Sequence, residues 1–284
     1  MGEKQRGDEL LTYLEYSVLM SVYIKESPEY LRIAIDSMLK QTIPPSEFVI
    51  VQDGPLTDRL YMVIDEFRIK FPGLFRIVAY QNNYGLGYAL QKGICACTKE
   101  IVARMDSDDW ASPVRMEVQL SVLQSKNLDM IGSQVTEFLE SPDAYISITN
   151  LPENHDEIRD FSKRRNPFRH PAMVYRRDMV IKAGNYSTDF LYFEDWDLFN
   201  RMLSIGCKAA NVHEPLVAMR VGEDFYARRG GVRYLKQVWM FKMEQVRNGY
   251  FTLFDFISSF APQLCVCLLP NNIRARIYKK LLRK

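Results

Sequence analysis

The sequence is poor in the residues that mark several common kinds of site. Its five cysteines are an odd number and include two C-x-C pairs, which fit neither a disulfide framework nor a zinc site. Its three histidines lie far apart and lack the spacing of metal ligands. No G-x-x-x-x-G-K-[ST] phosphate loop and no G-x-S-x-G elbow occurs. We therefore expect free thiols in a reducing cytoplasm, and neither a Walker-type nucleotide site nor a serine hydrolase.

Long apolar segments are also scarce. Residues 1–8 are polar and no apolar segment of the signal-peptide type follows them, so we expect no secretory leader. Near the other end, the charge-free apolar segment before Pro270 is Phe256–Leu269. Its 14 residues fall short of the roughly 20 that a membrane-spanning helix needs.

Material for a hydrophobic core, by contrast, is plentiful. The 284 residues are 47% hydrophobic and 25% charged, which predicts one large globular domain with an appendage, or two small domains. The net charge of +2 is unevenly distributed: residues 224–284 contain 12 lysines and arginines against 3 acids, so they carry +9 and the first 223 residues carry −7. This asymmetry predicts an anionic partner for the C-terminal region.

The last residues have the pattern of an amphipathic helix. Ile273, Ile277 and Leu281 recur every four residues among lysines and arginines. Such a helix suits the headgroups of an anionic membrane surface. The alternative is a helix that packs on the rest of the protein and leaves its basic face in solvent.

Strand and helix patterns alternate over the first half of the chain. Apolar runs rich in β-branched residues predict strands, and Ser27-Pro28 predicts a capped helix start. This alternation predicts an α/β fold with parallel strands and right-handed crossovers. We expect strands at 16–23, 47–52, 75–80, 101–105 and 130–138, and helices from Pro28 to before Pro44 and at 58–71, 85–97 and 113–124, the last capped by Ser112.

The second half is less regular. It predicts a loop around Asn166-Pro167, a short strand, helices that end at glycines, and a helical C-terminal region. The expected elements are a strand at 172–175, helices at 177–183, 198–205 and 229–246, and strand-like pieces within 208–220.

Three carboxylates within four residues follow the expected strand at 101–105. They are Asp106, Asp108 and Asp109, and they stand where ligands bind in open α/β sheets, at the carboxyl end of a strand. In extended backbone, the side chains of Asp106 and Asp108 leave on the same side. Two such oxygen ligands suit Mg²⁺ or Mn²⁺ shared with a phosphate. The alternative is a polar turn with a capping aspartate.

Two further side chains are expected at the same edge of the sheet. Asp53 ends the strand at 47–52, and its carboxylate can accept hydrogen bonds from a base or a ribose. Tyr23 ends the first strand and can pack on a base. The alternatives are a turn aspartate before Gly54 and ordinary packing of a tyrosine. Gly85-Leu86-Gly87 does not make a dinucleotide site, because it lacks the third glycine and follows the third strand rather than the first.

A second acid cluster, Glu194-Asp195-Trp196-Asp197, precedes a predicted helix. Packing these acids around a tryptophan costs repulsion unless a substrate, metal or cation uses them, which favours a general base with a tuned pKa. The alternative is that acids simply stabilise a helix N-terminus. The segments Ser17–Tyr23, Val51–Gly54, Arg104–Asp109 and Glu194–Leu198 thus occur in this order, with Asn83-x-Gly-Leu-Gly-x-Ala-Leu-x-x-Gly-Ile94 between the second and the third.

This combination resembles a family 2 glycosyltransferase of the GT-A fold from about Tyr16 to Arg220. The similarity extends to the bacterial branch that builds O-antigen, capsule and exopolysaccharide, partly through Arg220-x-Gly222-Glu-x-Phe-Tyr-x-Arg228-Arg229-Gly-Gly. The resemblance implies a Rossmann-like, mostly parallel sheet flanked by helices. It also implies an N-terminal extension at 1–15, a catalytic domain at 16–222 with a nucleotide half (16–110) and an acceptor half (111–222), and a helical, membrane-associated region at 223–284.

The resemblance also implies roles for residues. Asp53 is expected to hold the base or ribose, Asp106 and Asp108 to bind the donor through Mg²⁺ or Mn²⁺, and Asp195 to act as the base with Glu194 beside it. Many relatives have proline at Ser21 and histidine at Gly222, so the diphosphate is left to the nearby arginines. The remaining expected contacts are Tyr23, Glu26, Lys92, Arg220, Arg228 and Arg229 for the donor, and His170 and Trp196 for the acceptor.

The resulting hypothesis is an inverting transfer of a hexose from a UDP-sugar to a hydroxyl of a lipid-linked saccharide, at the inner face of the cytoplasmic membrane, with no nucleic-acid partner. A sugar-nucleotide pyrophosphorylase is less favoured, because Tyr23–Pro28 has no glycine to cradle a triphosphate. A catalytically inactive carbohydrate-binding or scaffold protein is the other alternative. The donor sugar, acceptor, linkage and oligomeric state stay open.

Overall fold

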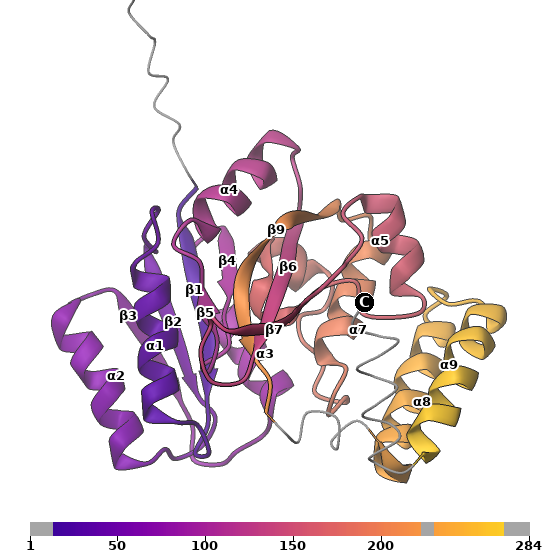
Figure 1. Ribbon diagram of the computed structural model, residues 1–284, viewed down its shortest axis with the longest axis horizontal. Helices are drawn as coiled ribbons and strands as arrows, with labels where there is room; N and C mark the ends of the chain where they lie inside the picture. Colours follow the sequence, from indigo (N-terminus) through magenta and orange to yellow (C-terminus); the bar gives the residue numbers. More distant parts are fainter. Residues whose placement is uncertain (1–13, 223–229, 270–284) are drawn as a thin grey trace, which may run out of the picture.

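The computed structural model describes residues 14–222 and 230–269, and these form an α/β fold (Figure 1). The predicted N-terminal extension (except residues 14–15) and the basic amphipathic helix predicted near Ile273 lie outside the described residues. In chain order the elements are β1 (Tyr16–Val22), α1 (Pro28–Leu39), β2 (Glu47–Gln52), α2 (Asp58–Lys70), β3 (Phe75–Ala79), α3 (Leu86–Ala96), β4 (Ile101–Arg104), β5 (Trp110–Ala111), α4 (Arg115–Ser125), β6 (Met130–Phe138), β7 (Tyr145–Ile148), α5 (His155–Ser162), the 3₁₀ turn η1 (His170–Ala172), β8 (Val174–Arg176), α6 (Arg177–Lys182), α7 (Glu194–Ser204), β9 (Ala209–Arg220), α8 (Gly231–Arg247) and α9 (Leu253–Leu268).

One sheet runs through the molecule in the order β3-β2-β1-β4-β8-β6-β9-β5, and β7 pairs with β6 off this path. The strands β3, β2, β1 and β4 are all parallel, as the alternating pattern predicts. Beyond β4 the sheet is mixed: β8 is antiparallel to both β4 and β6, while β9 is parallel to β6 and antiparallel to β5. The predicted α/β fold is therefore confirmed, with its parallel part confined to the first half and to the β6–β9 pair.

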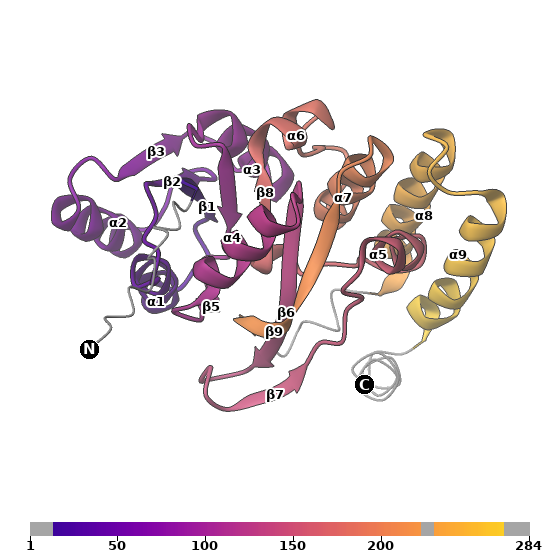
Figure 2. The ribbon, with the colours of Figure 1, turned by 90° about the horizontal axis from the view of Figure 1, so that it is seen from above.

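Helices cover both faces of the sheet. Figure 2 shows α1, α2 and α4 on one face and α3, α6 and α7 on the other. Alternate residues of each strand feed these two layers: Val18 and Met20 of β1 belong to the first core, and Leu19 belongs to the second. This alternation is what a sheet buried on both sides requires.

The expected cap of the helix after the acid-rich turn is wrong. The helix α4 begins at Arg115, its N-cap is Val114, and no side chain caps it. Ser112 is instead held by its backbone, because its N–H donates to Leu216 O (2.9 Å) and its carbonyl accepts from Gln41 Nε2 (2.8 Å). Because the helix starts at Arg115, Ser112 lies two residues before the N-cap position.

Other boundaries differ by a few residues or were missed. The helix α7 begins at Glu194, so the whole second acid cluster lies in its first turn rather than before it. The sequence pattern did not indicate β5, β7 or α5. These elements contain 2, 4 and 8 residues, which is too short for periodicity to distinguish them from loop.

The C-terminal helices α8 and α9 pack against each other at one end of the molecule (Figure 1). Trp239 of α8 lies edge-on to Phe256 and Phe260 of α9, with ring centroids 5.1 and 5.3 Å away. The predicted helix at 229–246 is thus confirmed as α8. Within residues 14–222 and 230–269, no helix is long and apolar enough to cross a bilayer.

Candidate active site

The carboxyl ends of β1, β2 and β4 form the edge at which the sequence places its candidate residues. Asp53, directly after β2, is buried and accepts three hydrogen bonds: from Tyr80 Oη (3.0 Å), Tyr84 N (2.9 Å) and Gly85 N (3.0 Å). It therefore fastens the start of α3 to the end of β2. A carboxylate has about four acceptor positions, so any ligand contact has to share Asp53 with this structural role.

Gly54 makes this close approach possible. Its φ is +85°, and a Cβ atom there would lie 2.9 Å from Asn83 N. Only glycine combines a left-handed backbone with that clearance. The D-G pair of the sequence thus has a structural explanation, and the donor-binding role of Asp53 stays a prediction.

The acid loop, Asp106–Asp109, connects β4 to β5. Ser107 and Asp108 form a turn, so the expectation of extended backbone is wrong. Asp109 is buried and accepts a hydrogen bond from Arg220 N (2.7 Å), while Arg220 Nε donates to Asp108 O (3.1 Å). The loop is anchored in this way because β9, which ends at Arg220, runs antiparallel beside β5.

Arg220 itself is held on several sides. Its guanidinium lies 3.7 Å from the ring centroid of Tyr30 and 4.5 Å from that of Phe138, and it donates to Leu139 O (2.9 Å). A guanidinium stacked between aromatic rings is rigid. The structure therefore gives Arg220 the role of a clamp on the acid loop, and its predicted contact with a diphosphate stays a prediction.

Negative charge accumulates in the acid loop. Burial, and then the charges of Asp106 and Glu26, raises the pKa of Asp108 to about 7. Burial also raises the pKa of Glu26, whose carboxylate accepts a hydrogen bond from Ser107 Oγ. Burial and the charge of Asp108 raise the pKa of Asp109 well above its ordinary value. A bound cation would stabilise the ionised form of these carboxylates.

The donor set fits a hard divalent metal that shares its coordination with a ligand. Among the described residues, no group of three or more His, Cys, Asp or Glu side chains has metal-binding geometry. Mg²⁺ in nucleotide sites commonly takes only one or two carboxylates and completes its shell with phosphate oxygens and water. Asp106 and Asp108 are therefore the residues that would hold it.

The second cluster lies in the first turn of α7. Glu194 is 7% exposed and its Oε2 has no partner within the described part of the chain. Burial, and then the charges of Asp195 and Asp106, raises the pKa of Glu194 to about 8. Asp197 differs, because its Oδ2 pairs with Arg201 Nε (2.8 Å) and its Oδ1 accepts from Gln245 Nε2 (2.9 Å). Asp197 therefore joins α7 to α8.

Asp195 is held through both carboxylate oxygens. Oδ1 accepts from its neighbour Trp196 N (2.7 Å), and Oδ2 accepts from Asn166 Nδ2 (2.8 Å) in the loop after α5. Both donors stabilise the ionised form of a carboxylate. An oriented, hydrogen-bonded carboxylate is suited to receive a proton from a hydroxyl.

Arg104 lies between the two acid clusters. It is buried at the end of β4 and forms an ion pair with Asp106. Its positive charge also opposes the rise in the pKa of Glu194. Since the charges of Asp106 and Arg104 both affect the pKa of Glu194, the acid loop and the first turn of α7 lie near each other.

His170 belongs to the wall of this region. Its Nε2 is 2.9 Å from Tyr186 Oη, which is 3.0 Å from Tyr175 Oη. Burial, and then the charge of Arg104, lowers the pKa of His170 well below its ordinary value, so the imidazole is neutral at pH 7. A neutral imidazole offers no charge to an anion, and the predicted contact of His170 with the acceptor stays a prediction.

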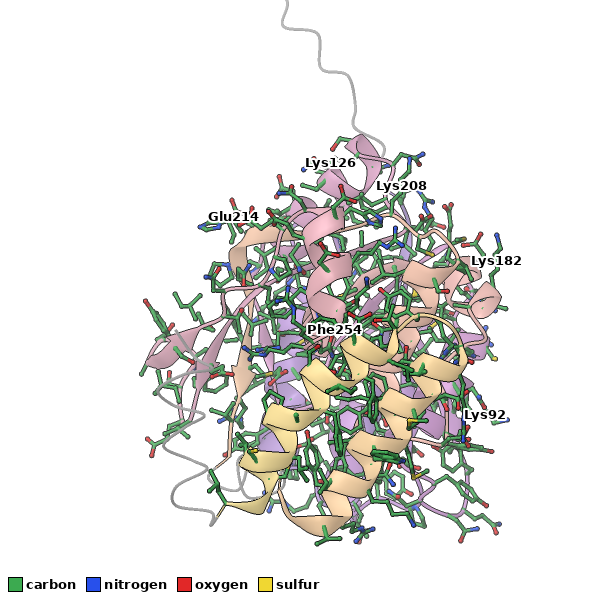
Figure 3. The ribbon with its side chains drawn as sticks, turned by 90° about the vertical axis from the view of Figure 1, so that its right-hand side faces the viewer. Lys92, Lys126, Lys182, Lys208, Glu214 and Phe254 are labelled. Atoms are coloured by element: carbon green, nitrogen blue, oxygen red, sulfur yellow. The ribbon has the colours of Figure 1, made fainter. Side chains whose placement is uncertain are left out.

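The remaining candidates are distributed differently. Tyr23 is exposed beyond β1, and its carbonyl accepts from Glu26 N (3.1 Å). Lys92 is exposed on α3 with its Nζ 5.1 Å from the ring centroid of Tyr88, and Figure 3 shows it at the molecular surface. Within the described residues, the contact of Lys92 is thus with an aromatic ring of its own helix. Arg228 and Arg229 lie outside the described residues.

Trp196 does not present a surface to an acceptor. Its indole is buried, its Nε1 donates to Ser162 O (2.8 Å), and its ring packs on Phe241 at 4.7 Å between centroids. The predicted acceptor contact is therefore not supported by this geometry. The burial explains why a tryptophan stands among these acids: it anchors the first turn of α7 between α5 and α8.

Three residues of the site were not singled out from the sequence. Arg104 directly precedes the acid loop, and a cation beside three acids was the available signal. Asn166 stands before a proline in a loop, which is a common turn pattern and carries no specific signal. Tyr186 reaches His170 only through the folded chain, so nothing in the sequence marks it.

Comparisons with known proteins show the family to which the chain is related. Residues 17–184 match the family described as Glycosyl transferase family 2. The chain is 35% identical over 272 residues to the Escherichia coli UDP-Gal:alpha-D-GlcNAc-diphosphoundecaprenol beta-1,3-galactosyltransferase. The aligned residues make up 95% of this chain and 97% of the galactosyltransferase. It is also 35% identical over 271 residues to the amylovoran biosynthesis glycosyltransferase AmsE of Erwinia amylovora, covering 93% and 98% of the two chains.

Solved structures add evidence on the fold. The mannosyltransferase PcManGT from Pyrobaculum calidifontis, in complex with GDP-Man and Mn²⁺, superposes with a TM-score of 0.63 at 16% identity, covering 94% of this chain and 73% of that one. At this identity the likeness concerns the fold alone. Taken with the family match over more than half of the sequence and the two full-length relatives, it leads to one conclusion: the chain belongs to glycosyltransferase family 2 and has the GT-A fold.

Proposed function

We propose that the protein is an inverting, metal-dependent hexosyltransferase that uses a UDP-sugar and a lipid-linked saccharide acceptor in the synthesis of a bacterial surface polysaccharide. The observation that carries this proposal is the convergence of the acid loop and the first turn of α7 around Arg104. The two relatives support the substrate classes, since one is named for UDP-Gal and a diphosphoundecaprenol acceptor and the other for amylovoran biosynthesis. The family assignment removes the pyrophosphorylase alternative.

The acid loop is the proposed donor-diphosphate site. Asp106 and Asp108 would hold Mg²⁺ or Mn²⁺ together with the phosphate oxygens of the donor. The ion would supply Lewis-acid neutralisation of the charge that develops on the leaving diphosphate. Arg220 clamps the loop so that both carboxylates keep their positions.

The nucleotide end of the donor is assigned to the neighbouring strand ends. Asp53 would accept a hydrogen bond from the base or ribose at its remaining acceptor position, and Tyr23, exposed beside it, would stack on the base. Glu26 and Lys92 are retained as weaker donor contacts, and Arg228 and Arg229 as diphosphate contacts. His170 is retained as an acceptor contact.

Asp195 is the proposed general base. It would take the proton from the acceptor hydroxyl as that oxygen attacks the anomeric carbon, on the face opposite to the leaving diphosphate. Asp197 is unsuited to this role because it is 2% exposed and its carboxylate forms an ion pair with Arg201, whereas Asp195 is partly exposed and the two donors given above for it carry no charge. Glu194 is unsuited because a carboxyl with a pKa of about 8 carries its own proton at neutral pH. As a neutral group, Glu194 would donate a hydrogen bond to a sugar hydroxyl.

The domain division and the location of the enzyme are parts of the same proposal. We divide the chain into an extension (1–15), a catalytic domain (16–222, with halves 16–110 and 111–222) and a helical region (223–284). We place the enzyme on the inner face of the cytoplasmic membrane, held by the basic amphipathic segment after residue 270. The outer face of α9 supports this placement, because Leu253, Phe254 and Ile257 are all exposed there, Phe254 by 78% (Figure 3). Exposed apolar side chains next to basic residues are typical of membrane-surface helices.

Transfer itself is the test of the function. The purified protein is incubated with a panel of nucleotide sugars and a synthetic lipid-diphospho-sugar acceptor, with Mn²⁺ or with a chelator, and the product is identified by mass spectrometry and by the configuration of its new bond. We expect UDP-Gal to be used, an inverted anomeric centre, and no product with the chelator. Donor-independent binding of saccharide without transfer would favour the scaffold alternative.

The membrane placement has a separate test. Co-sedimentation with liposomes containing anionic lipid compares the full chain with a version ending at Leu269 and with Phe254→Glu. We expect both changes to weaken binding, and added salt to weaken binding of the full chain. Equal partitioning of all three proteins would contradict the placement without touching the catalytic proposal.

A further inference from the structure

The proposed base Asp195 accepts a hydrogen bond from a loop residue that lies 29 positions before it in the sequence. Asn166 Nδ2 donates to Asp195 Oδ2 at 2.8 Å. The other end of the same amide, Asn166 Oδ1, accepts a hydrogen bond from Phe168 N at 3.1 Å. Because the oxygen of the amide is engaged by a backbone N–H, its nitrogen must face the carboxylate, and the orientation of the amide follows from its surroundings.

The loop is in turn fixed to the helix that carries Asp195. The Phe168 ring is buried and lies 5.2 Å from the ring of Phe199, edge to face, on α7. Pro167 restricts the backbone between Asn166 and Phe168, and its carbonyl accepts from Asn211 Nδ2 at 3.0 Å. The loop and α7 therefore form one rigid unit, in which a donor is aimed at one carboxylate oxygen.

We infer that Asn166 is a positioning residue for the transfer reaction: its amide holds the Asp195 carboxylate in the orientation that receives the acceptor proton. The inference rests on the proposed function of Asp195. The amide donates a hydrogen bond but does not give up its proton, so it orients the carboxylate without taking part in proton transfer. The effect of Asn166 therefore passes entirely through Asp195 and leaves the donor site untouched.

Asn166→Asp is the sharpest test because it is nearly isosteric. The aspartate keeps an oxygen for Phe168 N but replaces the donor to Asp195 with a second carboxylate oxygen. We expect kcat to fall by roughly 10–100-fold, the range typical of groups that orient a reacting ligand. The donor KM, and the thermal shift produced by UDP-sugar with Mn²⁺, should stay within about twofold of the wild-type values, because no donor contact changes.

A double-mutant cycle separates positioning from general damage. If Asn166 acts through Asp195, adding Asn166→Asp to Asp195→Asn should lower kcat by less than about twofold further, since the group being oriented is already gone. Phe168→Leu is the matched control, because it loosens the same loop but keeps the Asn166–Asp195 bond. It should retain more than about a third of the wild-type kcat.

The outcomes are distinguishable from failure of the proposed function. Full activity of Asp195→Asn overturns the assignment of the base. An inactive Asp195→Asn together with a fully active Asn166→Asp overturns only the positioning role. Equal losses in Asn166→Asp and Phe168→Leu, or an additive loss in the double mutant, would show that the loop acts through stability and would also overturn it.

Discussion

Replacing Glu194 by glutamine should stabilise the protein, and increasingly so as the pH rises. The carboxyl is 7% exposed, its Oε2 has no partner among the described residues, and its pKa is raised from 4.5 to about 8. Burial is the largest cause, followed by the charges of Asp195 and Asp106. Glutamine has nearly the same shape as the protonated acid but does not ionise.

The direction of this pH dependence follows from the number of protons bound by the folded and unfolded chains. Between pH 4.5 and about 8 the unfolded chain has released the Glu194 proton while the folded chain retains it. The folded state therefore binds more protons, and the free energy of unfolding of the wild type falls as the pH rises through this window. At about 1.36 kcal/mol per pH unit the window corresponds to about 5 kcal/mol. Relaxation of the site reduces this value, and we expect a gain of about 1–3 kcal/mol for Glu194→Gln at pH 8.

Urea unfolding in the presence of a chelator measures this gain at pH 5, 6, 7 and 8. The difference between variant and wild type should be small at pH 5, grow up to pH 8 and then level off. Glu214→Gln is the control, because Glu214 is exposed on β9 (Figure 3) and its replacement should change stability by less than about 0.5 kcal/mol. A Glu194→Gln variant that is less stable than wild type at pH 8, or a difference that does not vary with pH, would show that Glu194 is ionised and partnered in the folded protein.

Three further substitutions test the other acids and one buried cation. Asp195→Asn should lower kcat by roughly 10²–10⁴-fold while the affinity for UDP-sugar with Mn²⁺, measured by calorimetry, stays near wild type; a collapse of donor affinity would make Asp195 a donor ligand. Asp108→Asn should remove most transfer activity and most Mn²⁺-dependent donor binding while the circular dichroism spectrum is unchanged, and unaltered turnover with Mn²⁺ would contradict the metal site. Lys242→Met should raise the free energy of unfolding by about 1–3 kcal/mol at pH 7, because Lys242 is 0% exposed, its Nζ has no hydrogen-bond partner in the described part of the chain and lies 5.6 Å from the Trp196 ring centroid, and burial lowers its pKa to about 7. Since the unfolded lysine binds more protons between pH 7 and its ordinary value of 10.5, the gain should shrink as the pH rises through that range, and a constant gain in urea unfolding would show that packing rather than charge is responsible.

The first half of the fold was predictable because its signals are local. Ser27 caps α1 by accepting from Tyr30 N (3.3 Å), with Pro28 at the first helical position, as the sequence pattern indicates. The strands β1, β2 and β4 are mostly apolar and almost entirely buried, which is the expected pattern for parallel strands buried on both faces. The positions of Asp53 and the acid loop at one edge follow from parallel pairing alone.

The second half depends on contacts that are distant in sequence. Arg220 clamps Asp109, 111 residues before it, and Gln245 holds Asp197 from 48 residues away. No local pattern shows that β8 inserts between β4 and β6 in the antiparallel sense. The short elements β5 and β7 depend on pairing with β9 and β6, so their own sequences carry little of the information.

The second acid cluster shows what the structure adds to a motif. The local sequence pattern does not distinguish Glu194, Asp195 and Asp197, and only the family resemblance selects Asp195 as the base, with Glu194 beside it. In the folded chain these acids differ by their partners. Asp197 accepts hydrogen bonds from Arg201 and Gln245. Glu194 is buried, its Oε2 has no partner among the described residues, and it keeps its proton. Asp195 receives two donors that favour its ionised form. The same turn of α7 that presents Asp195 is therefore attached to α8 through Asp197 and to α5 through Trp196. Its acids and its tryptophan serve different tasks, and the geometry of the proposed base depends on the C-terminal helices even though none of their side chains is assigned to the reaction.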